Sequence, residues 1–365
     1  MTLKRTIVVV LAAFLFLATI PGSKAVDTGP IDEVRKKQTL SDQDLQVIDE
    51  FIAQAVQELV NTRDFTEIAK IRTIILSKQS DQKQYAQRFS ESAYNHISAA
   101  LARAQEFHED RKFKVTLNLL ILIDGLQDPR LTDLALGMVD SQRKAIRYWA
   151  ARCITNPGLV EKLNTGSSNP QLVPRILGQL SRVVDNSSAE VLAMMAEFAA
   201  SIDAPQGSDL LLQIADERIE AYRDWTVRYE LVDAVILKLL YSKVVTSSVG
   251  RRDVACRFAQ LYSCMIQRYT KGRELLSDTS KHYLASALIE VEDKCIGRLL
   301  GRRQSTIKRA VEEKDFETLK QEHDRLLGGE AAQGALPATL NFDYGTSSDD
   351  KRTAPLPLPE PSGTE

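Results

Sequence analysis

The sequence predicts an all-α protein built from antiparallel pairs of helices. Apolar residues recur at intervals of three and four along most of the chain, which is the spacing of one helix face. No hairpin turn dipeptide stands between alternating apolar runs, so the pattern does not favour strands. Successive helix pairs begin roughly 35–40 residues apart, which is the period of two-helix repeats.

Residues 1–25 have the three parts of a secretory signal peptide. Lys4 and Arg5 form the basic start, and residues 7–20 form the apolar core. Ser-Lys-Ala at 23–25 provides the small residues of a cleavage site. The apolar run is shorter than the ~20 residues that a membrane span needs. We therefore expect cleavage, no stable membrane span afterwards, and export to the periplasm or the extracellular space.

The helical repeat domain is expected over residues 41–328, after a mobile polar lead-in at residues 26–40. Ser41 has the position of an N-cap, with Asp44 three residues later in place of the usual capping-box acid. The helix that follows presents one apolar face, formed by Leu45, Ile48, Ile52, Val56, Leu59 and Val60.

Three further helices are expected before residue 130. The first is capped by Asp64 or Thr66, and the second spans residues 81–107. The third, residues 113–126, is apolar on all sides, so we expect it to be buried between neighbouring helices. A central strand is the alternative for this last segment, but no second strand candidate exists to pair with it.

Residues 130–154 show the helix-pair pattern most clearly. Two apolar faces are separated by Asp140 and Ser141, and Asn156-Pro157-Gly158 ends the second helix because proline cannot continue it. The first face contains Leu131, Leu134, Ala135, Met138 and Val139. The second face contains Ala145, Ile146, Trp149, Ala150, Cys153 and Ile154.

The order Met138-Val139-Asp140, then Ile146-Arg147, then Ala150-Ala151 resembles a HEAT repeat. The resemblance to this HEAT/armadillo-like superfamily implies a right-handed superhelical array of antiparallel helix pairs, an α-solenoid. It also implies that Asp140 and Arg147 tie one repeat to the next. The match is good over about one repeat, and the rest of the chain follows it only in rhythm.

The remaining domain continues this alternation of helices and turns. The final helix is rich in charge, which suits a terminal repeat whose outer face meets water. The helices are expected at residues 170–184, 191–202, 210–222, 225–241, 249–269, 276–300 and 316–327.

Residues 329–365 are expected to form a disordered, acidic, proline-rich tail. From Pro355 to Pro361 every second residue is proline, which forbids a helix and favours extended polyproline II. The segment is interpreted as a stiff solvated tail, and the alternative is a ligand for a proline-recognition module.

The sequence contains no recognisable catalytic or metal-binding motif, so no catalytic residue, metal ligand or cofactor is predicted. GxSxG, HExxH and glycine-rich phosphate loops are absent, and the four histidines are scattered. Ser305 and Lys308 match an SxxK motif, but the sheet that this chemistry requires is not predicted. The four cysteines are expected to be buried and reduced, with a Cys264–Cys295 bridge as the alternative.

One cluster of basic residues stands out near the end of the domain. One interpretation is a solvated face balanced by Glu312 and Glu313, and the other is contact with an acidic partner or an anionic envelope surface. The chain as a whole carries a formal charge of −2, which argues against general nucleic-acid binding. The cluster consists of Arg298, Arg302, Arg303, Lys308 and Arg309.

These features predict an exported, non-enzymatic helical-repeat scaffold that binds a protein or polymer partner in the cell envelope. One alternative is an envelope hydrolase that cleaves peptidoglycan or polysaccharide with a carboxylate pair. Only 6% of the residues are aromatic, which disfavours a sugar-stacking groove. The other alternative is a structural component of an envelope assembly, with the tail as its tether.

Overall fold

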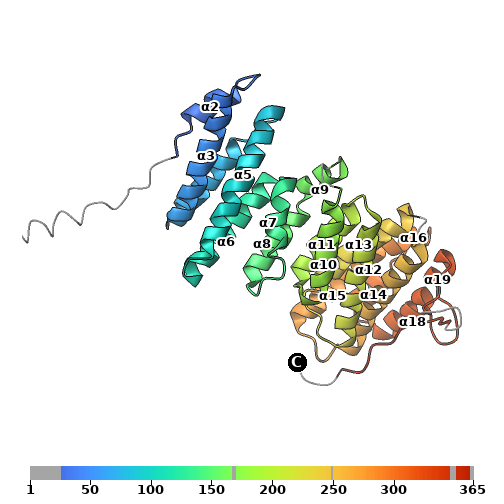
Figure 1. Cartoon of the computed structure of the whole chain (residues 1–365). Helices are drawn as coiled ribbons and strands as arrows, with labels where there is room; N and C mark the ends of the chain where they lie inside the picture. Colours follow the sequence, from blue (N-terminus) through green and yellow to red (C-terminus); the bar gives the residue numbers. More distant parts are fainter. Residues whose placement is uncertain (1–25, 167–169, 248–249, 346–350, 362–365) are drawn as a thin grey trace, which may run out of the picture. The chain divides into compact units, whose positions relative to one another are not determined.

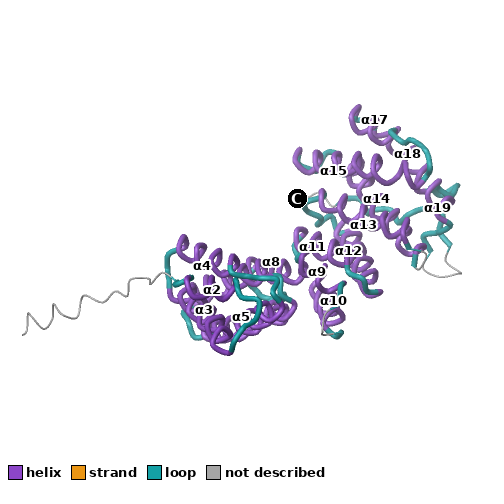
Figure 2. The backbone as a smooth tube through the Cα atoms, turned by 90° about the horizontal axis from the view of Figure 1, so that it is seen from above, coloured by secondary structure: helices purple, strands orange, loops and turns teal. Residues whose placement is uncertain are grey.

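The computed structural model describes residues 26–166, 170–247, 250–345 and 351–361 (Figure 1). These residues fold into helices and loops, and no strand occurs among them (Figure 2). The all-α prediction is therefore confirmed. The predicted signal peptide lies outside the described residues. The chain divides into two compact units, and the boundary falls within the 130–154 stretch.

The first unit extends to Met138 and includes residues 142–149. In this unit α3 packs against α4 and α5, and α6 also packs against α4 and α5. The predicted capping box is confirmed, because Ser41 and Asp44 bond each other's main-chain N–H groups. The elements are α2 (Gly29–Arg35), α3 (Asp42–Asn61), α4 (Phe65–Ser77), α5 (Lys83–Ala104), α6 (Glu109–Leu126), the short 3-10 turn η1 (Pro129–Leu131), α7 (Thr132–Leu136) and the start of α8 (Lys144–Thr155).

Residues 26–40 are not the mobile lead-in that we expected. Residues 29–35 form α2, which packs against α3. Ile31 and Val34 are buried, and the Lys78 ammonium bonds both carboxylate oxygens of Asp32 at 2.7 Å. Two apolar residues three positions apart are enough to anchor one short helix, although polar neighbours obscure them in the sequence.

The second unit contains residues 139–141 and the chain from Ala150 onward. From α10 to α15, helices pack mainly against the next helix or the one after it. The elements after α8 are α9 (Pro157–Asn164), α10 (Leu172–Val183), η2 (Val184–Asn186), α11 (Ala189–Ser201), α12 (Pro205–Arg223), α13 (Leu231–Thr246), α14 (Arg251–Lys271), α15 (Asp278–Val291), the π-helical turn η3 (Glu292–Ile296), α16 (Gly297–Leu299), α17 (Thr306–Glu313), α18 (Phe316–Leu327) and α19 (Ala335–Leu340).

Helix α14 is the centre of the second unit. It packs against α12, α13, α15, α18 and α19, and most of its length from Val254 to Tyr269 is buried. The preceding helix, α13, begins at Leu231 rather than at Trp225 as expected. Trp225 and Tyr229 adopt left-handed backbone conformations, with φ of 58° and 55°, which a helix does not allow.

The described part of residues 329–365 packs within the second unit, which corrects the prediction of a disordered tail. Residues 335–340 form α19, and Tyr344 donates its hydroxyl proton to the carbonyl oxygen of Leu327 at 2.8 Å. Leu358 is only 1% exposed. The acidic and proline-rich composition concealed a set of apolar residues that become buried, namely Leu336, Leu340, Phe342, Tyr344 and Leu358.

Candidate functional site

The predicted basic cluster lies where α15 gives way to α17. The helix first widens into the π-turn η3, continues as the single turn α16, and stops at Gly301. Gly301 has a φ of +63°, a left-handed conformation that glycine adopts at little cost. The chain then reverses through residues 302–305 and enters α17 at Thr306. A local change of helix geometry, rather than a long loop, therefore presents the basic residues.

Glu292 fixes the start of α17. Its carboxylate accepts the main-chain N–H groups of Ile307 and Lys308 at 2.9 and 2.7 Å, and so caps a helix whose own N-cap residue, Ser305, forms no side-chain cap. Glu292 is 1% exposed. Burial raises its pKa, while the two N–H donors act in the opposite direction. The π-turn thus provides the acid that holds Lys308 in place.

Four of the five predicted basic residues line one pocket of about 650 Å³, and Arg309 does not. Acidic residues also line it, but Asp293 pairs with Lys294 at 3.1 Å and Glu290 pairs with Lys238 at 2.8 Å. We call this the basic pocket, and its four predicted cations are Arg298, Arg302, Arg303 and Lys308.

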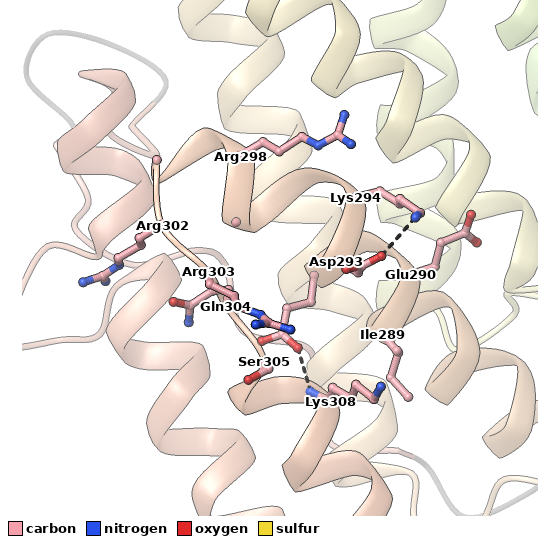
Figure 3. Close-up of a pocket in the computed structure, with 13 residues that line it drawn as sticks. Ile289, Glu290, Asp293, Lys294, Arg298, Arg302, Arg303, Gln304, Ser305 and Lys308 are labelled. Atoms are coloured by element: carbon pink, nitrogen blue, oxygen red, sulfur yellow. Dashed lines mark hydrogen bonds and ion pairs between the residues drawn. The ribbon is translucent and has the colours of Figure 1, made fainter.

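The basic pocket carries excess positive charge. Arg298, Arg302 and Arg303 are exposed and form no ion pair within 4 Å in the described chain, and Lys308 has only Glu312 at 3.8 Å. Figure 3 shows that the Arg298 and Arg302 side chains extend in different directions rather than converging on one point. This arrangement suits an extended anionic surface better than one small anion.

The two residues expected to tie repeats together are less informative. Asp140 is exposed in the turn before α8, and Arg147 is half-buried on α8. Neither forms an ion pair within 4 Å among the residues that the structure describes. Their role as repeat ties stays a prediction.

A hydrogen-bonded Ser–His–Asp series, which the sequence did not reveal, joins α14 to α18. Ser263 Oγ lies 2.8 Å from His323 Nε2, and His323 Nδ1 lies 2.8 Å from Asp324 Oδ1. The carboxylate of Asp324 can only accept, so the neutral His323 ring carries its proton on Nδ1, and its Nε2 accepts the Ser263 hydroxyl proton. Burial lowers the pKa of His323, which favours this neutral form.

This series has the distances of a catalytic triad but not the access that one needs. Ser263 is 0% exposed, so its oxygen cannot reach a substrate. We interpret the series as a tie between two helices. Ser263 and His323 are 60 residues apart, and no motif in the sequence connects them.

The clearest buried carboxylate pair also has a structural role. Asp233 accepts two hydrogen bonds from the Arg218 guanidinium, at 2.6 and 2.9 Å, and a third from Tyr222 at 2.7 Å. Glu230 lies 3.7 Å from Arg268, and burial raises its pKa. All of these side chains are buried, so they brace α12, α13 and α14 and are not open to a polysaccharide.

No protein-family model matches this chain, and no curated protein is significantly similar to it. Helices long and apolar enough to span a membrane are absent from the described residues. The four cysteines are free thiols, so the alternative Cys264–Cys295 bridge is not formed, and all except the half-buried Cys256 are buried as expected. Burial raises the pKa of both of these thiols to about 12, which makes them inert near neutral pH.

Proposed function

We propose that this chain is a non-enzymatic helical-repeat scaffold of the HEAT type, exported to the cell envelope, that binds an acidic protein or polymer through the basic pocket. The observation that carries the proposal is the group of three exposed arginines around one pocket with no ion pair in the described chain. Charges that are not neutralised within the protein are available to a partner of opposite sign.

The rest of the molecule supports a binding role. Successive helices pack in the order of helix pairs in both units, which is the construction of repeat scaffolds. The leader-like residues 1–25 support export. The near-neutral charge of the whole chain makes the basic pocket a local feature, so a partner would be directed to this face rather than to the whole surface.

The proposal is tested with labelled poly-L-glutamate as an acidic probe and fluorescence anisotropy as the readout. The triple variant Arg298→Gln, Arg302→Gln, Arg303→Gln should bind at least tenfold more weakly than the wild type. Binding by the wild type should also weaken steeply between low and physiological salt, because exposed charges are screened.

A matched control removes the same charge elsewhere. The variant Arg63→Gln, Arg182→Gln, Arg251→Gln changes three exposed arginines outside the basic cluster, so its affinity should stay within about twofold of the wild type after the change in net charge. Equal losses in the two triple variants, or no loss in either, would show that the basic pocket is not the binding site.

A further inference from the structure

The proline-rich residues 355–361 form no helix, and side chains of α14 and Trp225 hold them in place by bonding their main chain. Gln260 forms a two-point contact with Leu356: its Oε1 accepts the Leu356 N–H at 2.8 Å, and its Nε2 donates to the Leu356 carbonyl oxygen at 3.1 Å. An amide side chain paired in this way reproduces the bonding of a neighbouring strand.

The contacts continue toward the end of α14. Gln267 accepts the Leu358 N–H at 2.7 Å and donates to the Leu356 carbonyl oxygen at 3.2 Å. Lys271 donates to the Leu358 carbonyl oxygen at 2.7 Å, and Trp225 Nε1 donates to that of Pro359 at 3.1 Å. The segment therefore runs parallel to α14, and each of these bonds is made to its main chain.

The alternation of prolines matches this set of partners. Prolines have no N–H group, so between Pro355 and Pro359 only Leu356 and Leu358 can donate from the main chain. Both donors are taken up by a glutamine Oε1. No donor in this stretch is left without an acceptor, and a chain without prolines would bring additional N–H groups that need partners.

Two side chains of the segment enter the surface of the second unit. Pro355 and Leu358 are buried, whereas Leu356 is 37% exposed and Pro357 and Pro359 are also exposed. The buried positions are three residues apart, which is the period of polyproline II. One face of the segment is therefore bound by apolar contact, and its main chain is bound by hydrogen bonds.

The segment does not fill the groove in which it lies. A cavity of about 990 Å³ remains beside it, bounded by Ala354, Pro355 and Pro357 on one side and by α18 residues including His323 on the other. We call the site formed by Trp225, Gln260, Gln267 and Lys271 the α14 groove. Gln267 and Lys271 also line the cavity, so there is room beside this part of the tail.

We propose that the α14 groove is a recognition site for an extended, proline-alternating segment of a partner protein, and that residues 353–361 occupy it in cis. Main-chain recognition does not depend on the ligand belonging to the same chain. A tethered segment competes at a high effective concentration, in the millimolar range for short flexible linkers, so the tail holds the groove until a better-fitting or more concentrated segment replaces it.

The test uses the full chain carrying Leu358→Asp, because a carboxylate at a buried apolar position expels the tail. A labelled peptide of residues 353–361 with the natural sequence should bind this variant at least tenfold more tightly than it binds the wild type. Adding Gln260→Ala should weaken that binding by about tenfold, because the two bonds that Gln260 makes to Leu356 are lost and only the bond from Gln267 remains. A peptide carrying Leu358→Asp is the negative control.

A charge exchange tests the same site without altering a buried position. Lys271 pairs with Glu360 at 2.8 Å, so Lys271→Glu should bind a peptide carrying Glu360→Lys more tightly than the natural peptide, and the wild type should show the opposite preference. Peptide binding that is equal in wild type and Leu358→Asp, or unaffected by Gln260→Ala, would overturn the proposal. Wild-type dimerisation that Leu358→Asp abolishes would instead assign the groove to the tail of a second copy.

Discussion

The basic pocket and the α14 groove belong to the same unit but would bind their ligands through different kinds of interaction. In the basic pocket the arginines are exposed, diverge in direction and have no ion pairs in the described chain. In the α14 groove each glutamine bonds defined main-chain atoms, and Leu358 is almost fully buried. The basic pocket attracts opposite charge without fixing the orientation of its ligand. The α14 groove fixes the position of its ligand by directional hydrogen bonds and burial rather than by net charge.

The difference indicates what each site can discriminate. Exposed charge accelerates encounter and favours any partner of opposite sign, but it is screened by salt. Directional hydrogen bonds and a buried side chain reject segments whose donors or apolar residues fall at the wrong spacing. One molecule can thus combine loose capture at the basic pocket with pattern-specific binding at the α14 groove.

The largest effect is expected from removing Glu292, which caps α17 and so supports the basic pocket. Glu292→Ala should lower the free energy of unfolding by about 3 kcal/mol, because the N–H groups of Ile307 and Lys308 lose their acceptor in a buried place. Chemical denaturation gives the value. Poly-L-glutamate binding should also weaken in this variant, while the tail should stay docked in the α14 groove.

Glu290→Ala is the matched control, because Glu290 is half-buried and pairs with Lys238. Its loss should cost no more than about 1 kcal/mol. A similar loss of stability in both variants would mean that helix capping by Glu292 is not what supports the basic pocket.

The next largest effect is expected from Gly328→Ala, which should disturb the tail in the α14 groove and leave the basic pocket intact. Gly328 has φ 109° and ψ 150°, a region that only glycine adopts readily, and a Cβ atom there would overlap the carbonyl oxygen of Thr353. Gly328→Ala should therefore lower the free energy of unfolding by about 2 kcal/mol and release residues 353–361. Denaturation measures the first effect, and faster proteolysis of the tail measures the second.

Gly137→Ala provides the contrast. Gly137 has φ −68°, and a Cβ atom there would have no neighbour within 4 Å. This substitution should be neutral or slightly stabilising, since alanine restricts the unfolded chain. If Gly328→Ala were equally harmless, the start of the tail would not be packed as the structure shows.

The two sites also differ in how far the sequence predicts them. The basic residues of the pocket lie within a dozen positions of one another, so their sequence alone suggests a positive surface. The pocket geometry was not predictable, because it depends on the π-turn and on Glu292, which looks like an ordinary helical acid. The exclusion of Arg309 follows from that local geometry as well.

The α14 groove could not be predicted because its parts are remote in the sequence. Gln260 and Leu356 are 96 positions apart, and a glutamine on a helix is usually a solvated residue. The alternating prolines did indicate an extended segment, and recognition by a proline-binding surface was an alternative interpretation. What the sequence did not contain was the location of such a surface within the same chain.

The smallest expected effect links the α14 groove to pH through His323. Its pKa is lowered from the usual 6.5, chiefly by burial and against the opposing influence of Asp324. The unfolded chain therefore binds a proton that the folded chain does not, so stability is fully present above pH 6.5 and falls as the pH drops toward the folded pKa. The loss cannot exceed about 1.4 kcal/mol per pH unit.

Protonated His323 cannot accept the Ser263 hydroxyl proton, and Ser263 is bonded to Gln267 of the groove. Glu230 and Glu292 have raised pKa values, so their protonation stabilises the folded protein as the pH falls. The pH dependence of the wild type alone therefore does not show the contribution of His323. Denaturation of wild type and His323→Gln at pH 7.5 and 5.5 does: the wild type should lose more stability than the variant. Parallel losses would show that His323 does not couple pH to this side of α14.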